Sequence, residues 1–376
     1  MTTHNISRTL DLAKLLKKKS YFLLGPRQTG KSFLIKQSFG STLTYNLLDT
    51  TTYLNLAQNP KRLEQEITAK TKHIIIDEIQ RLPQLLNEVH LLIEEHGIHF
   101  LLTGSSARKL RKGGVNLLGG RARTKYLHPF TYKELKHHFN LQRALHNGLI
   151  PSIYFSDDPD ADLVAYNGTY LKEEIIAEGV TRNIPAFSRF LQVASYCNGS
   201  VMNFTNIASD AQVPRTTVYE YFDILKDTLI MKELPAWDKS IKRKPLVSSK
   251  YYFFDVGVVR SLQKRIYNAG TPEFGEAFET YLFHELSSYV DYQSQETLSF
   301  WRSSSGFEVD FILGDHTAIE VKAKKNVSEA DLKGLRAISE EKKFKKYFCV
   351  SLESRPRKVG NIDILPYQSF LDELYG

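Results

Sequence analysis

The chain has 376 residues, of which 42% are hydrophobic and 24% are charged, and its formal net charge is +8. This length exceeds what one hydrophobic core organises and this composition excludes extensive disorder, so we expect several folded domains. The positive charge permits a polyanionic partner without requiring one. No apolar run approaches the roughly 20 residues of a membrane-spanning helix, which predicts a protein without a membrane segment. Cys197 and Cys349 lack metal-ligand spacing, which indicates reduced thiols and a cytoplasmic location.

The first part of the chain alternates short apolar runs with segments of helical periodicity. Strands that alternate with helices are typical of a parallel sheet. We therefore expect an α/β domain with a parallel sheet in residues 1–145. The strand candidates are residues 21–24, 43–48, 73–76 and 98–102.

A glycine-rich segment follows the first strand candidate. Gly25-Pro-Arg-Gln-Thr-Gly-Lys-Ser32 fits the pattern G-x-x-x-x-G-K-[ST] and precedes a helix candidate at residues 33–39. In this P-loop motif, backbone N–H groups and the positive end of the helix dipole surround phosphate oxygens. Lys31 would reach the β- and γ-phosphates, and Ser32 would ligate Mg. The sequence therefore predicts an ATP site with Mg, formed by Gly25, Pro26, Arg27, Gln28, Thr29, Gly30, Lys31 and Ser32.

Two adjacent carboxylates, Asp77 and Glu78, end the third strand candidate. Because neighbouring residues of a strand point in opposite directions, Asp77 can face the Mg ion while Glu78 acts as general base on the attacking water. The next strand candidate ends in Thr103-Gly-Ser105, and a turn-forming Thr-Gly-Ser explains these residues nearly as well as a role in orienting that water. Which of Thr103 and Ser105 contacts the nucleotide stays open.

The chain resembles, over almost its whole length, the AAA-type ATPases of bacteria and archaea that join this core to an uncharacterised nuclease-like domain. The resemblance implies that Arg121 senses or neutralises the γ-phosphate, in its own subunit or in a neighbouring subunit of a homo-oligomer; a solvated loop arginine is the alternative. The segments that carry the resemblance are the P-loop, Asp77-Glu-Ile-Gln80, Leu102-Thr-Gly-Ser-Ser, Leu118-Gly-Gly-Arg121 and His128-Pro-Phe-Thr-Tyr-Lys-Glu134.

Residues 146–200 are predicted to form a helical lid or linker that ends at the Cys197-Asn-Gly-Ser break. Residues 201–260 then show two amphipathic helices and a hairpin with a basic stretch at 237–245, the pattern of a winged helix. Such modules bind DNA, but they also serve as lids or protein docking surfaces. The residues predicted to point outward from the second helix are Arg215, Thr216 and Glu220.

Residues 261–376 are predicted to form an α+β domain with a helix followed by a hairpin. Segments 307–313 and 317–323 alternate strictly between apolar and polar residues, and three residues separate them. We therefore expect Leu313 to pair with Thr317 across the hairpin.

In this register Asp310 faces Glu320, and Glu308 faces Lys322. Opposed carboxylates repel each other, so a Mg ion is expected between Asp310 and Glu320, with Lys322 orienting a metal-bound water. These residues resemble the catalytic set of PD-(D/E)XK nucleases, and the resemblance implies that Glu279 on the preceding helix is a further metal ligand. The alternative is a solvated sheet face with a plain Glu308–Lys322 ion pair.

The combined prediction is an α/β P-loop ATPase core, a helical and winged-helix region, and an α+β restriction-endonuclease-like domain. Such a protein would use ATP and Mg to bind or process DNA, either duplex or branched. Two alternatives stay open. One is a nucleotide switch whose C-terminal domains bind protein partners without nuclease activity, and the other is a sequence-specific regulator.

Overall fold

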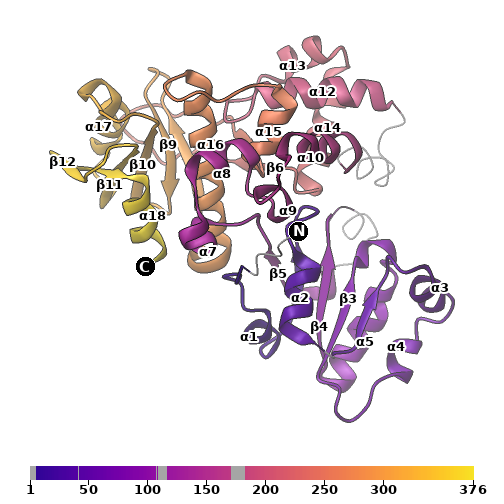
Figure 1. The fold of residues 1–376 in the computed structure, drawn as a ribbon. Helices are drawn as coiled ribbons and strands as arrows, with labels where there is room; N and C mark the ends of the chain where they lie inside the picture. The colour runs from indigo at the N-terminus through magenta and orange to yellow at the C-terminus, as the bar shows by residue number, and fades with distance from the viewer. Residues whose placement is uncertain (1–5, 41, 107, 109–116, 171–182) are drawn as a thin grey trace. The chain divides into compact units, whose positions relative to one another are not determined.

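The computed structural model describes residues 6–40, 42–106, 108, 117–170 and 183–376 (Figure 1). The chain divides into two compact units. Unit 1 comprises Met1–Pro129 and Asp227–Ile230, and unit 2 comprises Phe130–Lys226 and Met231–Gly376. Within the described ranges, no helix combines the length and the apolar character that crossing a bilayer requires.

Unit 1 is organised around a five-stranded parallel sheet with the strand order β2-β3-β4-β1-β5. The predicted parallel sheet is confirmed, and all four strand candidates form strands. The fifth strand was not predicted, because its sequence Ala-Arg-Thr-Lys-Tyr is polar and partly exposed rather than an apolar run. The strands are β1 (Ser20–Leu24), β2 (Thr44–Asn46), β3 (His73–Asp77), β4 (His99–Gly104) and β5 (Ala122–Tyr126).

Helices whose apolar residues recur at helical spacing pack on this sheet. In α5 the buried residues are Leu85, Leu86, Val89 and Leu92, and they join the strands in one hydrophobic core. This helix ends at Gly97, whose φ of 64° lies in the left-handed region that glycine adopts readily. The helices are α1 (Leu12–Leu16), α2 (Lys31–Phe39), α3 (Thr50–Gln58), α4 (Arg62–Gln65) and α5 (Leu85–His96), with 3₁₀ turns η1 (Ile79–Arg81) and η2 (Leu117–Gly120).

The short segment Asp227–Ile230 belongs to unit 1, although the chain on either side of it belongs to unit 2. Its Leu229 packs against the hydrophobic core of unit 1. Its Asp227 pairs with Arg108, with 3.4 Å between Oδ2 and Nη1. An apolar contact and an ion pair thus hold this segment on unit 1.

Unit 2 begins with helices that lead to a helix pair. The predicted helix end at Cys197 is confirmed, because α12 ends there; residues 171–182 of the predicted helical stretch lie outside the described residues. The two predicted helices of the pair are also present as α13 and α14. The helices are α7 (Tyr132–Leu135), η3 (Lys136–His138), α8 (Leu141–Asn147), α9 (Pro151–Tyr154), α10 (Pro159–Ala165), η4 (Tyr166–Tyr170), α12 (Ile184–Tyr196), α13 (Phe204–Ala211), α14 (Arg215–Asp227) and α15 (Val256–Gln263).

The rest of unit 2 contains a six-stranded mixed sheet with the order β12-β13-β11-β10-β9-β8 and a separate two-stranded sheet, β6-β7. The predicted pairing of Leu313 with Thr317 is confirmed. The strands are β6 (Met231–Leu234), β7 (Lys250–Phe253), β8 (Leu298–Arg302), β9 (Glu308–Leu313), β10 (Thr317–Lys322), β11 (Lys346–Ser351), β12 (Arg357–Val359) and β13 (Ile362–Pro366). The helices are α16 (Pro272–Tyr289), η5 (Val290–Ser294), η6 (Glu329–Leu332), α17 (Lys333–Ser339) and α18 (Tyr367–Tyr375).

The basic stretch that the sequence predicts as a wing, residues 237–245, lies between the antiparallel strands β6 and β7. Isolated backbone bridges hold its two ends beside β8 and the residue that follows it. Lys239 pairs with Asp315 at 2.6 Å, and Arg243 pairs with Glu340 at 3.0 Å. Acidic side chains of the same unit therefore neutralise part of the positive charge that a DNA-binding wing would present.

Candidate functional site

The glycine-rich loop Gly25–Ser32 connects β1 to α2, as predicted. Gly30 caps α2 with a φ of 92°, a conformation that favours glycine. A side chain at Gly25 is also excluded, because a Cβ there would lie 2.4 Å from the carbonyl oxygen of Leu127. Thr29 Oγ1 donates to the carbonyl of Pro26 at 2.9 Å and closes the loop on itself.

Lys31 lies at the mouth of this loop with a buried side chain. Its Nζ donates to the carbonyl oxygens of Gly25 at 2.6 Å and Pro26 at 3.0 Å. Both of these acceptors are neutral, so the ammonium charge is held in position without being cancelled by them. An incoming phosphate would therefore meet a positive charge at this loop.

The two predicted halves of the Mg site meet at the carboxyl edge of the sheet. Ser32 Oγ donates to Asp77 Oδ2 at 3.0 Å. Thr103 Oγ1 donates to the other oxygen of Asp77, and it accepts the N–H of Glu78 at 3.3 Å. A hydroxyl and carboxylate oxygens are the ligands that Mg prefers, so these residues fit a Mg ion.

Glu78 occupies a strained turn after β3, with a φ of 61°. Its carboxylate accepts a hydrogen bond from Nε2 of Gln80, which also donates to Ser105 Oγ at 3.2 Å. Sequence analysis missed Gln80 as a positioning residue. A Cβ at Gly104 would lie 2.4 Å from Gln80 Oε1, so glycine at this position leaves room for the Gln80 side chain.

Thr103 and Ser105 thus contact different partners. Thr103 binds the carboxylate of Asp77, and Ser105 reaches Glu78 through Gln80. Which of the two hydroxyls orients the attacking water stays a prediction.

Arg121 lies at the opposite edge of the sheet from the P-loop of its own chain. It precedes Ala122, which pairs with Ser20 at the start of β1, whereas the P-loop follows the end of β1. Its guanidinium forms an ion pair with Glu94 of α5. The structure therefore does not bring Arg121 to its own nucleotide site, and a role toward a neighbouring subunit stays a prediction.

The acidic residues of the β9–β10 hairpin come together in unit 2. The strand pairing continues only as far as Ile319 opposite Phe311, and Asp310 Oδ2 then accepts the N–H of Val321 at 2.7 Å. Glu320 lies on the neighbouring strand, and both carboxylates are buried. The side chain of Asp310 thus accepts the hydrogen bond of an N–H group that a backbone carbonyl would otherwise accept in the hairpin.

The predicted ion pair between Glu308 and Lys322 is wrong. Lys322 Nζ pairs with Glu320 at 2.6 Å, whereas Glu308 pairs with Lys250 at 2.6 Å and with Arg302 at 3.4 Å. The reason is that the hairpin pairing ends at Ile319 opposite Phe311, while β7 brings a second lysine to the same acids.

Lys250 is the residue of this cluster that sequence analysis missed. Its side chain is only 4% exposed, and its Nζ also lies 3.4 Å from Glu279 Oε1. Tyr252 on the same strand donates to Glu279 Oε1 at 2.5 Å. Lys250 and Glu279 belong to a strand and a helix that the sequence assigned to different domains, so no local pattern linked them.

Burial and charge shift the pKa values of this cluster in a consistent way. Burial, with the Glu279 carboxylate, raises the pKa of Asp310 to about 6. Burial and the nearby Asp310 raise the pKa of Glu320 well above its usual value. Burial alone would lower the pKa of Lys250 and Lys322, but the surrounding carboxylates outweigh it and raise both values. Both lysines therefore stay charged at neutral pH.

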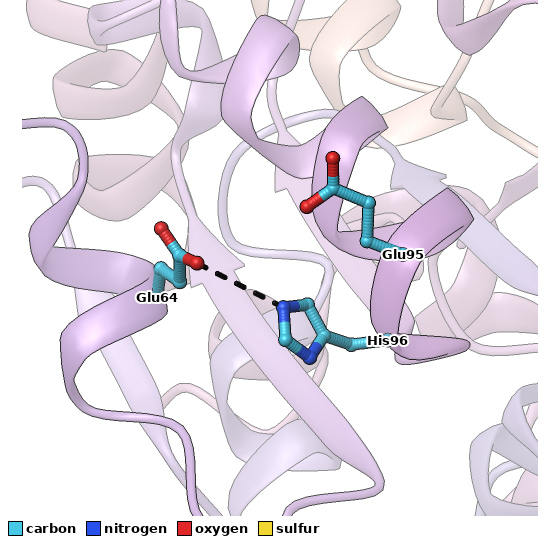
Figure 2. Close-up of side chains that lie close together, drawn as sticks. All are labelled: Glu64, Glu95 and His96. Atoms are coloured by element: carbon cyan, nitrogen blue, oxygen red, sulfur yellow. Dashed lines mark ion pairs between the residues drawn. The ribbon is translucent and has the colours of Figure 1, made fainter.

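One group of three residues in the described ranges brings possible metal-ligand atoms within 4.8 Å of one another, and it lies elsewhere. Glu64, Glu95 and His96 form this group on the surface of unit 1, with 3.9 Å between His96 Nε2 and Glu64 Oε1 (Figure 2). All three side chains are exposed, and exposed acidic groups of this kind are common without a metal. Glu279, Asp310 and Glu320 do not form such a group in the described ranges.

The sheet order, the P-loop and the paired Ser32 and Asp77 define a P-loop nucleotide-binding domain. Residues 17–136 match the family model described as the AAA domain. Two further models, described only as domains of unknown function, DUF8612 and DUF4143, match residues 138–268 and 274–370.

Similar proteins occur in bacteria and archaea. The chain is 26% identical over 301 residues to an uncharacterized protein of Mycobacterium tuberculosis, covering 77% of this chain and 66% of that protein, which is slightly under two thirds. It is 23% identical over 341 residues to an uncharacterized protein of Methanocaldococcus jannaschii, covering 82% and 75%. The Orc1 protein of Aeropyrum pernix in complex with DNA matches at 15% identity and a TM-score of 0.25, covering 67% of this chain and 90% of that one.

Proposed function

We propose that the protein is a Mg-dependent ATPase that couples ATP turnover to the binding or processing of nucleic acid. The hydrogen bond from Ser32 Oγ to Asp77 Oδ2, at 3.0 Å, carries the ATPase part of the proposal. It joins the phosphate-binding loop to the strand end that bears the acidic residues. The match of residues 17–136 to the AAA domain supports the same conclusion.

Each residue of this site has a separate task in the proposed hydrolysis. The amides of Gly25–Ser32 and the N-terminus of α2 hold the phosphate oxygens, and Lys31 adds a charge to them. Ser32 and Asp77 offer oxygen ligands to Mg, which neutralises phosphate charge when it is bound. Glu78 accepts the proton of the attacking water as general base.

Nucleic-acid binding is proposed for unit 2. The apolar face of α14 is buried, and its exposed face presents Arg215 and Thr216, as a recognition helix does. The Arg215 guanidinium lies 5.5 Å from the ring centre of Tyr219, and its Nη2 donates to the Tyr219 hydroxyl at 2.9 Å. Lys242 and Lys244 are also exposed, and such cations bind phosphate groups without sequence preference.

An ATPase assay tests this proposal, with and without Mg and with duplex, single-stranded or branched DNA. Lys31→Ala should lose nucleotide binding, because Lys31 supplies the charge at the β- and γ-phosphates. Lys36→Ala is the matched control, since Lys36 is exposed on the same helix. Stimulation by DNA supports coupling, and a rate that no DNA changes favours the nucleotide switch. Absence of Mg-dependent hydrolysis would contradict the ATPase proposal.

A second candidate function is Mg-dependent cleavage of nucleic acid by unit 2. We infer that Asp310, Glu320 and Lys322 act as one catalytic unit and that Glu279 is a further metal ligand, as in the nucleases that these residues resemble. Glu320 Oε2 favours this function, because it is buried without a hydrogen-bond partner among the described residues and can accept a cation.

Asp310→Ala tests the cleavage proposal. It should abolish Mg-dependent cleavage, while ATP hydrolysis without DNA should persist because the P-loop belongs to unit 1. Losses in Asp310, Glu320 and Lys322 variants should not add, since residues that act as a unit are not additive. Wild-type protein that cleaves no DNA would contradict the proposal.

A further inference from the structure

Strand β7 places two side chains on the carboxylate cluster of unit 2. Lys250 and Tyr252 are two residues apart and therefore lie on the same face of the strand. Lys250 Nζ lies 2.6 Å from Glu308 Oε1 and 3.4 Å from Glu279 Oε1. Tyr252 donates to the same oxygen of Glu279 at 2.5 Å. Glu279 is thus bound to β7.

These contacts explain why the acids of the cluster do not converge on one point. Glu279 is held by β7, Glu320 is held by Lys322 at 2.6 Å, and Asp310 accepts the backbone N–H of Val321. A divalent ion needs several oxygen ligands around one position. Here the ligands stay apart because lysine ammonium groups and a backbone amide already bind them.

The position of Lys250 is fixed from several sides. Its backbone pairs with Leu234 of β6 and forms an isolated bridge with Val201. Its ammonium group lies 5.3 Å from the ring centre of Phe300. The side chain is therefore held in place by packing and backbone pairing as well as by the acids.

We propose that Lys250 is a tethered cation that occupies the cation-binding position of this cluster and excludes divalent metal ions. Its ammonium group between Glu279 and Glu308 would repel a metal ion and keeps both carboxylates engaged. Without it, Glu279 keeps only its hydrogen bond from Tyr252, the carboxylate of Glu308 loses its closest cation, and the buried Glu320 Oε2 supplies an oxygen that has no hydrogen-bond partner among the described residues. The inference goes beyond the proposed ATPase function and competes with the second candidate function, because a cluster that excludes divalent ions does not cleave nucleic acid with Mg.

Metal binding to the full chain tests the inference, without ATP or DNA. Mn²⁺ serves as the probe in calorimetric titration and in thermal melts, and all variants carry His96→Ala to remove the surface group of Glu64, Glu95 and His96. Lys250→Met is compared with Lys250→Arg, which keeps the positive charge.

Wild-type protein and Lys250→Arg should show no Mn²⁺ binding that depends on Asp310. Lys250→Met should melt at a lower temperature in chelator, since removal of the cation leaves buried carboxylates uncompensated. Mn²⁺ should restore its melting temperature and bind at least about tenfold more tightly than to wild type. Adding Asp310→Asn to Lys250→Met should abolish this binding.

The inference is overturned if wild-type protein binds Mn²⁺ as tightly as Lys250→Met does, or if folded Lys250→Met binds none. Where Lys250→Met does not fold, the double variant Lys250→Met with Glu308→Gln removes one charge of each sign. Failure of this double variant to bind Mn²⁺, or to fold in its presence, also overturns the inference. ATP hydrolysis, measured separately on wild type, decides the ATPase proposal independently of these results, whereas Mg-dependent DNA cleavage by wild type that Asp310→Ala abolishes would overturn the inference.

Discussion

Both units contain a buried lysine, but the partners of the two lysines differ. Lys31 of unit 1 donates to the neutral carbonyl oxygens of Gly25 and Pro26 in the phosphate-binding loop. Lys250 of unit 2 is bound by the carboxylates of Glu279 and Glu308, so its charge is balanced within the protein. Backbone carbonyls therefore place Lys31 on the phosphate-binding loop, whereas carboxylates hold Lys250 within the protein.

Among the variants considered, Glu78→Gln should cause the largest change, a loss of ATP turnover in unit 1. The variant should bind ATP normally, but its turnover should fall by roughly 10²–10⁴-fold because the general base is lost. Nucleotide binding and single-turnover hydrolysis measure the two effects separately, and Glu95→Gln on the surface of the same unit is the control. Near-normal turnover would show that Glu78 is not the general base. The contrast between the two units would then lose its support from unit 1.

Glu285 of unit 2 extends the comparison to a buried carboxylate whose hydrogen-bond donors are neutral groups rather than a lysine. Glu285 is fully buried and accepts hydrogen bonds from the N–H of Tyr132 and the hydroxyl of Tyr375, both at 2.8 Å. Burial raises its pKa to about 8. Because the folded-state pKa exceeds the unfolded value, this group stabilises the fold below the unfolded pKa, about 4.3, and this contribution is lost as the pH rises toward 8.

Glu285→Gln should therefore flatten the dependence of stability on pH. Between pH 5 and 8 the wild type should lose up to about 1.4 kcal/mol of stability per pH unit through this group, and the variant should lose less. Thermal melts across this range measure the difference, with Glu373→Gln as an exposed control. Parallel curves for wild type and Glu285→Gln would show that the buried carboxylate does not control the pH dependence.

Arg121→Ala should have the smallest effect on stability. Its ion pair with Glu94 is partly exposed to solvent, and such surface pairs contribute little, so the melting temperature should stay close to that of the wild type. If Arg121 acts on the nucleotide of a neighbouring subunit, the variant should lose ATPase activity only at protein concentrations that permit association. Glu94→Ala is the control, and a loss of activity that is the same at all protein concentrations would contradict the role toward a neighbour.

Sequence analysis predicted features that depend on local patterns. The P-loop, the strand before it and the acidic end of β3 follow from short runs of residues, and the hairpin register follows from alternation around a short loop. It failed where distant segments meet. The polar strand β5 carries no apolar signal, and Lys250 reaches Glu308 from another strand.

The β9–β10 hairpin shows that a correctly predicted strand register does not suffice to predict the side-chain pairs. Alternation predicted which residues share a face, but it did not predict that Asp310 would accept the N–H of Val321. Once that side chain replaces a strand partner, the pairs beyond it change, and Glu308 binds Lys250 rather than Lys322.

The segment Asp227–Ile230 has a consequence for the order in which the protein is made. Residues 1–129 contain the whole P-loop sheet, but unit 1 also includes four residues that are synthesised nearly a hundred positions later. During translation the ATPase core therefore forms first without Leu229 against its hydrophobic core and without the Arg108–Asp227 ion pair. A fragment that ends at Pro129 would also lack Asp227–Ile230. Unit 1 is therefore complete only after most of the helical part of unit 2 has been synthesised.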